Sequence, residues 1–502
     1  MKAVASFLES RWMPPVLLLS FAALLALISL GIPTHNDEGV WLYMGKMWAQ
    51  KGLLPYVDTL DNKPPGIYYV YALASLFPGI GYVAGRVLAM AASVSAAAIV
   101  LGGLSRYHSR QAGAIGAACF SLASCWQYTQ GALVHVTETY VVLFVVAAWY
   151  FALKARNRHQ QSGSVWPWLV CSGAALAAAI NFKQVALTSF AALALIIVLY
   201  GVTKRDWRGM LCALAAYGAG LILAFLAVLL PLLLSGVSLH VYWEGAWLIL
   251  LQPGMKSDAS LTHQIYTGLV KWTSPEMRLF LPFLLFLVCR AVRDPEKRFV
   301  AAALLIWIAF DFLGVNASGR YFGHHFKQIL PSLCIMAGYS AAELLRLTFH
   351  EEEQHRQAFA ALVLTIVLLF FPANATLNGL SHVFFQKADR AQEIGQWVRE
   401  HSTEDDYVQM AGGAITQVLP FTERQAPGRL FHHCLFSLLG AQREFLRDVE
   451  RHPPRYVIFD REPDEERPPW LTEWVQRYYR PVHEDFGIAV CERTTGEVGS
   501  QQ

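Results

Sequence analysis

Two adjacent carboxylates, Asp37 and Glu38, follow the first apolar run of the chain at 14–32. A carboxylate held at a membrane surface can take a proton from an acceptor hydroxyl or bind a metal ion. Neighbouring helical positions point in different directions, so we expect the two acids to have different roles. The same residues also fit a helix start, because Thr34 and Asp37 have the spacing of a capping box. Both interpretations stay open at this point.

A lysine closes the same polar segment. Lys63 stands between Asp61-Asn62 and two prolines at 64–65. Because a proline disfavours helical backbone at the preceding residue, we expect Lys63 in an extended or turn conformation. A lysine there either snorkels to the lipid headgroups or places a cation where it meets a phosphate at the mouth of the bilayer.

Two further charged residues interrupt apolar runs. Glu138 lies in VHVTETYVV and Lys183 in INFKQVAL. Ionisable residues at such depth are costly and usually face a cavity or a partner. Glu138 also suits a solvated turn. Lys183 has almost no loop around it, which favours a functional role near the membrane surface.

The corner at 316–331 carries a concentrated cationic cluster that includes Arg320, His324 and His325. Two adjacent histidines lack the i,i+4 spacing of helical metal ligands, so they predict a metal site only weakly. An anion site is the more natural interpretation, with Arg320 as a bidentate donor.

The composition is that of a membrane protein. The chain has 502 residues, of which 55% are hydrophobic and only 15% are charged. Soluble globular chains carry about 25% charged residues, so we expect a polytopic α-helical membrane protein. The net charge of +3 gives no indication of a nucleic-acid partner.

The apolar runs predict the number of membrane spans, since one span needs about 20 mostly apolar residues. We expect about eleven spans, over 14–32, 82–104, 111–130, 139–153, 165–182, 184–202, 209–234, 278–291, 298–315, 327–345 and 358–376. The apolar run at 64–79 is excluded, because counting it as a span would move the basic loops that follow to the outer face. It is short, bounded by prolines and rich in tyrosine, and we expect it to lie on the outer leaflet.

This arrangement puts the N-terminus inside and assigns a set of polar segments to the outer face. These are 33–81, 130–139, 181–184, 235–277, 316–327 and the residues from 377 on. The aromatic-rich loop at 235–277 suits a substrate lid or a carbohydrate platform, and equally an interfacial belt. Because the polar interruptions gather on this face, we expect the chemistry there.

The tail at 377–502 alternates helical and strand patterns, which predicts a small α/β domain. The expected helices are 385–400, 441–451 and 470–479, and the expected strands are 407–410, 455–460 and 487–491. The tail also holds two cysteines, Cys434 and Cys491. They are candidates for a disulfide in an oxidising compartment, although spacing alone does not establish the pairing.

The motifs HNDEG at 35–39 and PYVDTLDNKPPGIYY at 55–69 resemble those of bacterial membrane glycosyltransferases of family 39. These are relatives of the protein O-mannosyltransferases and of the aminoarabinose transferase that modifies lipid A. The Glu138 corner, FKQ around Lys183, and GRYFGHHFKQILP are similar to later motifs of the family. The resemblance implies a GT-C fold with juxtamembrane helices, so that 1–376 is the catalytic membrane domain and 377–502 a periplasmic domain.

The resemblance also implies roles for individual residues. It implies that Asp37 is the catalytic or substrate-positioning carboxylate, and that Lys63, Lys183 and Arg320 bind the donor phosphate. Glu38, beside Asp37, is the second expected catalytic residue. The remaining expected substrate-binding residues are Glu138, His324, His325, Tyr56 and Tyr68. One departure is the spacing Asp61-Asn62-Lys63, because stricter relatives have DKPP. Metal use differs among relatives, so a divalent metal stays an open possibility and no other cofactor is expected.

The expected activity is transfer of one sugar from a polyprenyl monophosphate carrier to an acceptor outside the cytoplasm. The expected location is the bacterial inner membrane, with the active site on the periplasmic side. The acceptor class stays open among lipid A, a polysaccharide, another glycolipid and a protein. Two alternatives stay open as well: a transporter or flippase of lipid-linked sugars, and a non-catalytic subunit of an envelope-polysaccharide assembly.

Overall fold

In the computed structural model the chain divides into a helical unit and an α/β unit. The helical unit is Met1–Ile32, Arg86–Leu229 and Ala259–Gln386, and the α/β unit is Pro33–Gly85, Leu230–Asp258 and Lys387–Gln502. The residues that the structure describes are 13–27, 30, 32, 34–77, 81–124, 136–161, 163–252, 255, 259–272, 277–348, 390–412, 415–460, 467–485 and 487–494.

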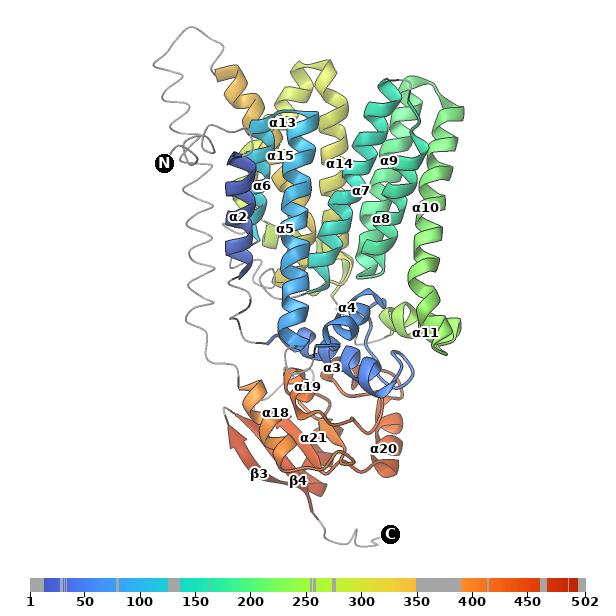
Figure 1. Ribbon diagram of the computed structural model, residues 1–502, viewed down its shortest axis with the longest axis vertical. Coiled ribbons are helices and arrows are strands. Elements are labelled where there is room, and N and C mark those ends of the chain that lie inside the picture. Colours follow the sequence, from blue (N-terminus) through green and yellow to red (C-terminus); the bar gives the residue numbers. More distant parts are fainter. Residues whose placement is uncertain are drawn as a thin grey trace. The chain divides into compact units, whose positions relative to one another are not determined.

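The helical unit contains all or most of a series of helices, of which the longer ones are apolar (Figure 1). They are α2 (Met13–Leu27), α5 (Gly81–Tyr107), α6 (Arg110–Ala123), α7 (Thr137–Gln160), α8 (Trp166–Ile180), η3 (Gln184–Ala186), α9 (Leu187–Lys204), α10 (Trp207–Leu234), α12 (Leu261–Trp272), η5 (Met277–Phe280), α13 (Leu281–Arg293), η6 (Pro295–Lys297), α14 (Arg298–Asn316), η7 (Gly323–Ile329) and α15 (Leu330–Thr348). Helix α7 packs along α8, α6 along α15, and α9 along α14. Trp149 of α7 stacks on Trp307 of α14 with ring centroids 4.0 Å apart, which marks the interior of this unit.

Within the described residues, six helices are long and apolar enough to cross a membrane. They are Gly81–Tyr107, Thr137–Gln160, Gln184–Lys204, Trp207–Leu234, Pro295–Asn316 and Gly323–Leu347, and two shorter apolar helices are Pro15–Leu27 and Trp166–Ile180. The chain is therefore a multi-pass membrane protein. The total of about eleven spans stays a prediction, because the run at 358–376 lies outside the described residues.

The excluded run at 64–79 forms the short helix α4 (Gly66–Ala74), which has nine residues. At about 1.5 Å per residue such a helix is roughly half as long as a hydrocarbon core of about 30 Å. Helix α4 is therefore too short to cross a bilayer. The loop predicted at 235–277 also contains helices within its described part, namely α11 (Leu239–Ala246), η4 (Leu248–Leu251) and α12.

The α/β unit combines a small sheet with short helices from distant parts of the chain (Figure 1). Besides α4, α11 and η4 it contains α3 (Asn36–Lys51), α18 (Ala391–Glu400), β1 (Val408–Met410), η9 (Thr416–Val418), α19 (Leu419–Thr422), η10 (His433–Leu435), α20 (Ala441–Arg451), β2 (Tyr456–Asp460), α21 (Pro469–Tyr478), β3 (Tyr479–Asp485) and β4 (Ile488–Arg493). The sheet order is β1-β2-β4-β3. Strand β2 pairs parallel to β1 and antiparallel to β4, and β3 pairs antiparallel to β4.

The C-terminal sheet agrees with the predicted α/β pattern, with one strand added. Helix α20 covers 441–451 as predicted, whereas strand β3 has no counterpart among the predicted strands. Strand β3 lies at the sheet edge, is mostly exposed and has an irregularity beside Pro481. Because the strand buries few of its side chains, its sequence does not alternate between apolar and polar residues, and the pattern did not predict it. Cys491 pairs in register with Val457 in the sheet, and no disulfide joins it to Cys434.

Most residues of helix α3 are buried, although polar and charged residues interrupt its apolar sequence. It packs against α4, α19 and η9, and Trp41, Tyr43 and Met44 are each at most 1% exposed. Two glycines allow this approach. A Cβ at Gly45 would lie 2.5 Å from the Tyr71 backbone carbon, and a Cβ at Gly39 would overlap the backbone of Gln417. Helix α3 is therefore part of the core of the α/β unit.

Replacing Gly45 by valine tests this packing. We expect Gly45→Val to destabilise the protein by about 3 kcal/mol, the upper end of the range for overpacking, because the obstacle is backbone and cannot rotate away. Gly102→Ala in α5 is the control, since a Cβ there meets nothing within 4 Å. Thermal unfolding in detergent measures both. A Gly45→Val protein that melts with the wild type would contradict the close contact.

Candidate active site

The two adjacent carboxylates lie in the first turn of α3. His35 is the N-cap residue, and its Nδ1 accepts a hydrogen bond from the Asp37 amide at 3.2 Å. The Glu38 carboxylate accepts from the His35 amide at 3.4 Å, which completes a capping box. The sequence pattern placed the first residue of the capping box at Thr34, whereas in the structure it is His35, one residue later. Glu38 is fully buried and holds the helix start, whereas Asp37 is half-buried.

Asn36 fixes the same helix start from the other side. Its Oδ1 accepts from the Thr416 amide at 2.9 Å, and its Nδ2 lies 3.3 Å from His433 Nδ1. Farther along α3, Lys46 donates to the Glu423 carboxylate at 2.9 Å. Burial raises the pKa of Glu423, but the Lys46 ammonium outweighs it and holds that pKa below its usual range. Asp37 therefore lies in the first turn of a helix that is held both at its start and at Lys46, and the helix dipole favours a carboxylate in that turn.

Lys63 lies in a turn held by two buried tyrosines. The hydroxyls of Tyr56 and Tyr68 donate to the Lys63 carbonyl at 2.6 Å and 3.0 Å. Both tyrosines are 0% exposed, and burial raises the pKa of each well above its usual range, so both stay neutral donors. Tyr56 has φ +69°, a strained backbone that its surroundings must maintain. The structure gives the tyrosines a positioning role, and their direct contact with a substrate stays a prediction.

Asp61 is a buried carboxylate that sequence reasoning did not count as a site residue. Its Oδ2 accepts from Trp41 Nε1 at 2.9 Å and from the Tyr68 hydroxyl at 3.3 Å. Its Oδ1 lies 3.9 Å from His432 Nε2. Asp61 therefore connects α3, the Lys63 turn and the segment around His432. The sequence signal was its position in the DNKPP motif, close to the DKPP of stricter relatives.

A second group of charged side chains lies in the helical unit, where Lys183 forms an ion pair with Glu138. Glu138 is 1% exposed, and its other oxygen accepts from the Thr137 hydroxyl at 2.9 Å. His324 Nε2 lies 4.0 Å from the Glu138 carboxylate. Glu138 at the start of α7, Lys183 before η3 and His324 of η7 thus lie close together although they are far apart in the sequence. The partner of the buried Glu138 carboxylate is Lys183.

The other polar residues of the corner at 316–331 differ in their burial and in their hydrogen-bond partners. Lys327 is 2% exposed and donates to the Thr139 hydroxyl at 2.8 Å. His325 Nδ1 lies 3.5 Å from Ser318 Oγ, and the Arg320 amide donates to that same hydroxyl at 3.3 Å. Ligand atoms of Glu138, His324 and His325 all lie within 4.8 Å of one another, which is compatible with a cation. Because Lys183 already neutralises Glu138, a metal ion would have to displace it.

Asp311 is a further buried acid that the site prediction left out. It is 0% exposed and accepts hydrogen bonds from Ser189 at 2.8 Å and from Ser332 at 3.2 Å. These contacts satisfy the carboxyl inside the helical unit. They give Asp311 a structural role between α14, α9 and α15.

The Glu138–Lys183 pair predicts a specific pattern of stability. Lys183→Met should destabilise the protein by about 3–5 kcal/mol, because it leaves a buried carboxylate without its partner. Glu138→Gln combined with Lys183→Met should restore part of that loss, since the buried charge is gone. Thermal unfolding of the two single variants and the double variant, without donor, measures the coupling. Losses that simply add would mean that the pair does not couple.

Comparisons with known proteins give the fold. No family model and no curated protein matches the chain. The apo structure of ArnT from Cupriavidus metallidurans, an aminoarabinose transferase, has a TM-score of 0.66 at 15% identity, over 95% of this chain and 97% of that one. The same protein bound to undecaprenyl phosphate has a TM-score of 0.62 at 16% identity, over 98% and 100%.

A third solved structure is more distant. It is the oligosaccharyltransferase AglB from Archaeoglobus fulgidus in complex with an inhibitory peptide and a dolichol-phosphate, with a TM-score of 0.53 at 13% identity, over 97% of this chain and 75% of that one. Likeness at such identity concerns the fold. The chain therefore has the GT-C fold of these membrane glycosyltransferases, as its sequence motifs predict.

Proposed function

We propose that this protein transfers one sugar from a polyprenyl monophosphate carrier to an acceptor outside the cytoplasm. The observation that carries the proposal is the rigid mounting of a half-buried carboxylate, Asp37, on a capped and buried helix in a chain of GT-C fold. Two proteins of that fold were solved with undecaprenyl phosphate and with dolichol-phosphate, which supports a polyprenyl phosphate carrier.

The reaction is a displacement at the anomeric carbon. The acceptor oxygen forms the new bond to that carbon, the bond from the carbon to the phosphate oxygen breaks, and polyprenyl phosphate leaves. Asp37 takes the acceptor proton as the bond forms, which is the role of a general base. Glu38 contributes by holding the first turn of α3 through its cap contact with His35, and any direct catalytic part for it is secondary in this proposal.

The phosphate of the donor requires cations. Lys63 is the first candidate, because two tyrosine hydroxyls fix its carbonyl and thereby the turn that carries its side chain. Lys183 and Arg320 are further candidates. Lys183 is paired with Glu138, so a phosphate that binds Lys183 would share or replace that carboxylate. Glu138, His324 and His325 would then contact the sugar or the acceptor.

The proposed location is the bacterial inner membrane, with the site and the C-terminal sheet on the periplasmic side. The distribution of Lys and Arg along the chain supports this orientation. The acceptor class stays open, and the segment 235–277 and the C-terminal residues are the candidates for choosing it. A transporter or a non-catalytic subunit would bind the same donor without breaking the bond between sugar and phosphate.

Reconstitution separates these functions. We expect purified protein in lipid vesicles, given a polyprenyl-phosphate sugar and an extract of envelope acceptors, to release polyprenyl phosphate and label an acceptor in equal amounts. Chromatography of the lipid products measures the release. Sugar that crosses the vesicle membrane while still attached to its carrier would support the transporter instead.

Lys63→Ala tests the phosphate contact in the same assay. Loss of one charge-assisted hydrogen bond is worth about 1.5–3 kcal/mol, so the donor KM should rise roughly tenfold to a hundredfold while the acceptor KM changes little. Lys51→Ala, at the exposed end of α3, is the matched control and should leave both values unchanged. An equal rise in both KM values for Lys63→Ala would count against a phosphate role.

A further inference from the structure

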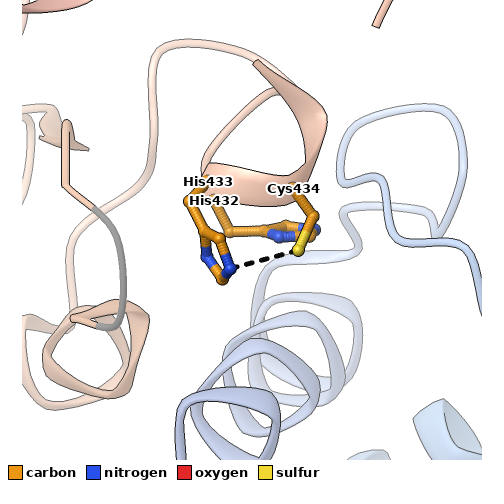
Figure 2. A group of neighbouring side chains, drawn as sticks. All are labelled: His432, His433 and Cys434. Atoms are coloured by element: carbon orange, nitrogen blue, oxygen red, sulfur yellow. Dashed lines mark hydrogen bonds between the residues drawn. The ribbon is translucent and has the colours of Figure 1, made fainter. Parts of the chain in front are cut away.

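A histidine pair followed by a cysteine lies in the α/β unit, in a segment that the proposed function does not use. His432, His433 and Cys434 occupy consecutive positions at the start of η10, and Figure 2 shows their polar atoms turned toward one another. One ligand atom from each residue lies within 4.8 Å of the other two. His433 Nε2 and Cys434 Sγ are 3.2 Å apart.

The histidine in this group that is most deeply buried has unmet hydrogen-bonding capacity. His432 is 3% exposed, and among the described residues neither of its ring nitrogens has a hydrogen-bond partner. A buried polar group without a partner costs about 1–3 kcal/mol, so such a histidine indicates a ligand. The Asp61 carboxylate is 3.9 Å from Nε2, which is too far for a hydrogen bond.

The donor set identifies the chemistry of that ligand. Two imidazoles and a thiolate suit zinc and similar d-block cations rather than magnesium or calcium, which prefer oxygen. Zinc binds sulfur at about 2.3 Å and imidazole nitrogen at about 2.0–2.1 Å, so ligand atoms of one tetrahedral site lie roughly 3–4 Å apart. The 3.2 Å between His433 Nε2 and Cys434 Sγ already lies in that range, and the other ligand atoms lie within 4.8 Å of one another.

The surroundings supply the contacts that usually support metal-bound histidines. Asp61 faces His432, and its other oxygen is already held by Trp41 and Tyr68. A carboxylate in such a position orients a ligand ring. A cation here would therefore be linked through Asp61 both to Trp41 of α3 and to the segment before Lys63.

We propose that His432, His433 and Cys434 form a site for a zinc-class divalent cation, with Cys434 as the thiolate and Asp61 supporting His432. The site is linked to α3 through Asp61 and Trp41, and it shares no residue with the group of Glu138, His324 and His325. It stands on the geometry of the α/β unit and does not depend on the glycosyltransferase activity.

Metal analysis of the full-length protein tests the site. We expect protein purified in detergent without chelator to retain about one zinc ion per chain after dialysis. After chelation, added Co²⁺ should give the thiolate-to-cobalt absorption band. Added Zn²⁺ should remove that band and raise the melting temperature. Wild-type protein that keeps no zinc and gives no thiolate band would overturn the proposal.

Variants assign the ligands. Cys434→Ser should lose the cobalt band and the rise in melting temperature, and His433→Ala should weaken zinc binding at least tenfold. Cys212→Ser is the matched control, because Cys212 is an exposed cysteine of α10, and it should keep the band. His324→Ala should also keep it. A band that persists in Cys434→Ser, or disappears in Cys212→Ser or His324→Ala, would place the metal elsewhere and refute the site.

Discussion

The close backbone contact of α3 is the constraint on which the α/β unit depends. Gly45 meets the backbone at Tyr71, and Gly39 meets the backbone at Gln417, so the helix lies against α4 on one side and the C-terminal residues on another. Because the contact is made by backbone, α3 has little freedom to shift. The backbone that carries Asp37 is therefore held in place, which supports the proposed role of this residue as a general base.

Burial of charge imposes a second constraint, which each unit meets in its own way. The helical unit pairs Glu138 with Lys183 directly. The α/β unit instead surrounds Asp61 with neutral donors, from Trp41 and Tyr68. A buried ion pair is weak support for stability but expensive to break, whereas a carboxylate held only by neutral donors has no cationic partner that a second cation would have to displace. The first arrangement suits exchange with an anionic substrate, and the second suits a cation nearby.

Much of the membrane part followed from the sequence because a span is a local property. Apolar runs of sufficient length coincide with α5, α7 and the span Gln184–Lys204, and the ionisable residues at or beside their ends, such as Glu138 and Lys183, form an ion pair in the structure. Side-chain roles that depend on tertiary contacts were not accessible. The hydroxyls of Tyr56 and Tyr68 point to the Lys63 carbonyl, and His432 meets Asp61 across more than three hundred residues of sequence. Nothing in local periodicity encodes such pairs.

In the proposed mechanism Asp37 does chemistry that the other acids of the same segment do not. The most direct measurement is kcat for transfer from a polyprenyl-phosphate sugar by Asp37→Asn, beside Asp58→Asn, which changes an exposed acid of the same segment. General-base catalysis contributes about 10²–10⁴-fold, so Asp37→Asn should lose at least about a hundredfold in kcat with an unchanged melting temperature, and Asp58→Asn should match the wild type. An Asp37→Asn protein that transfers sugar at the wild-type rate would contradict the account.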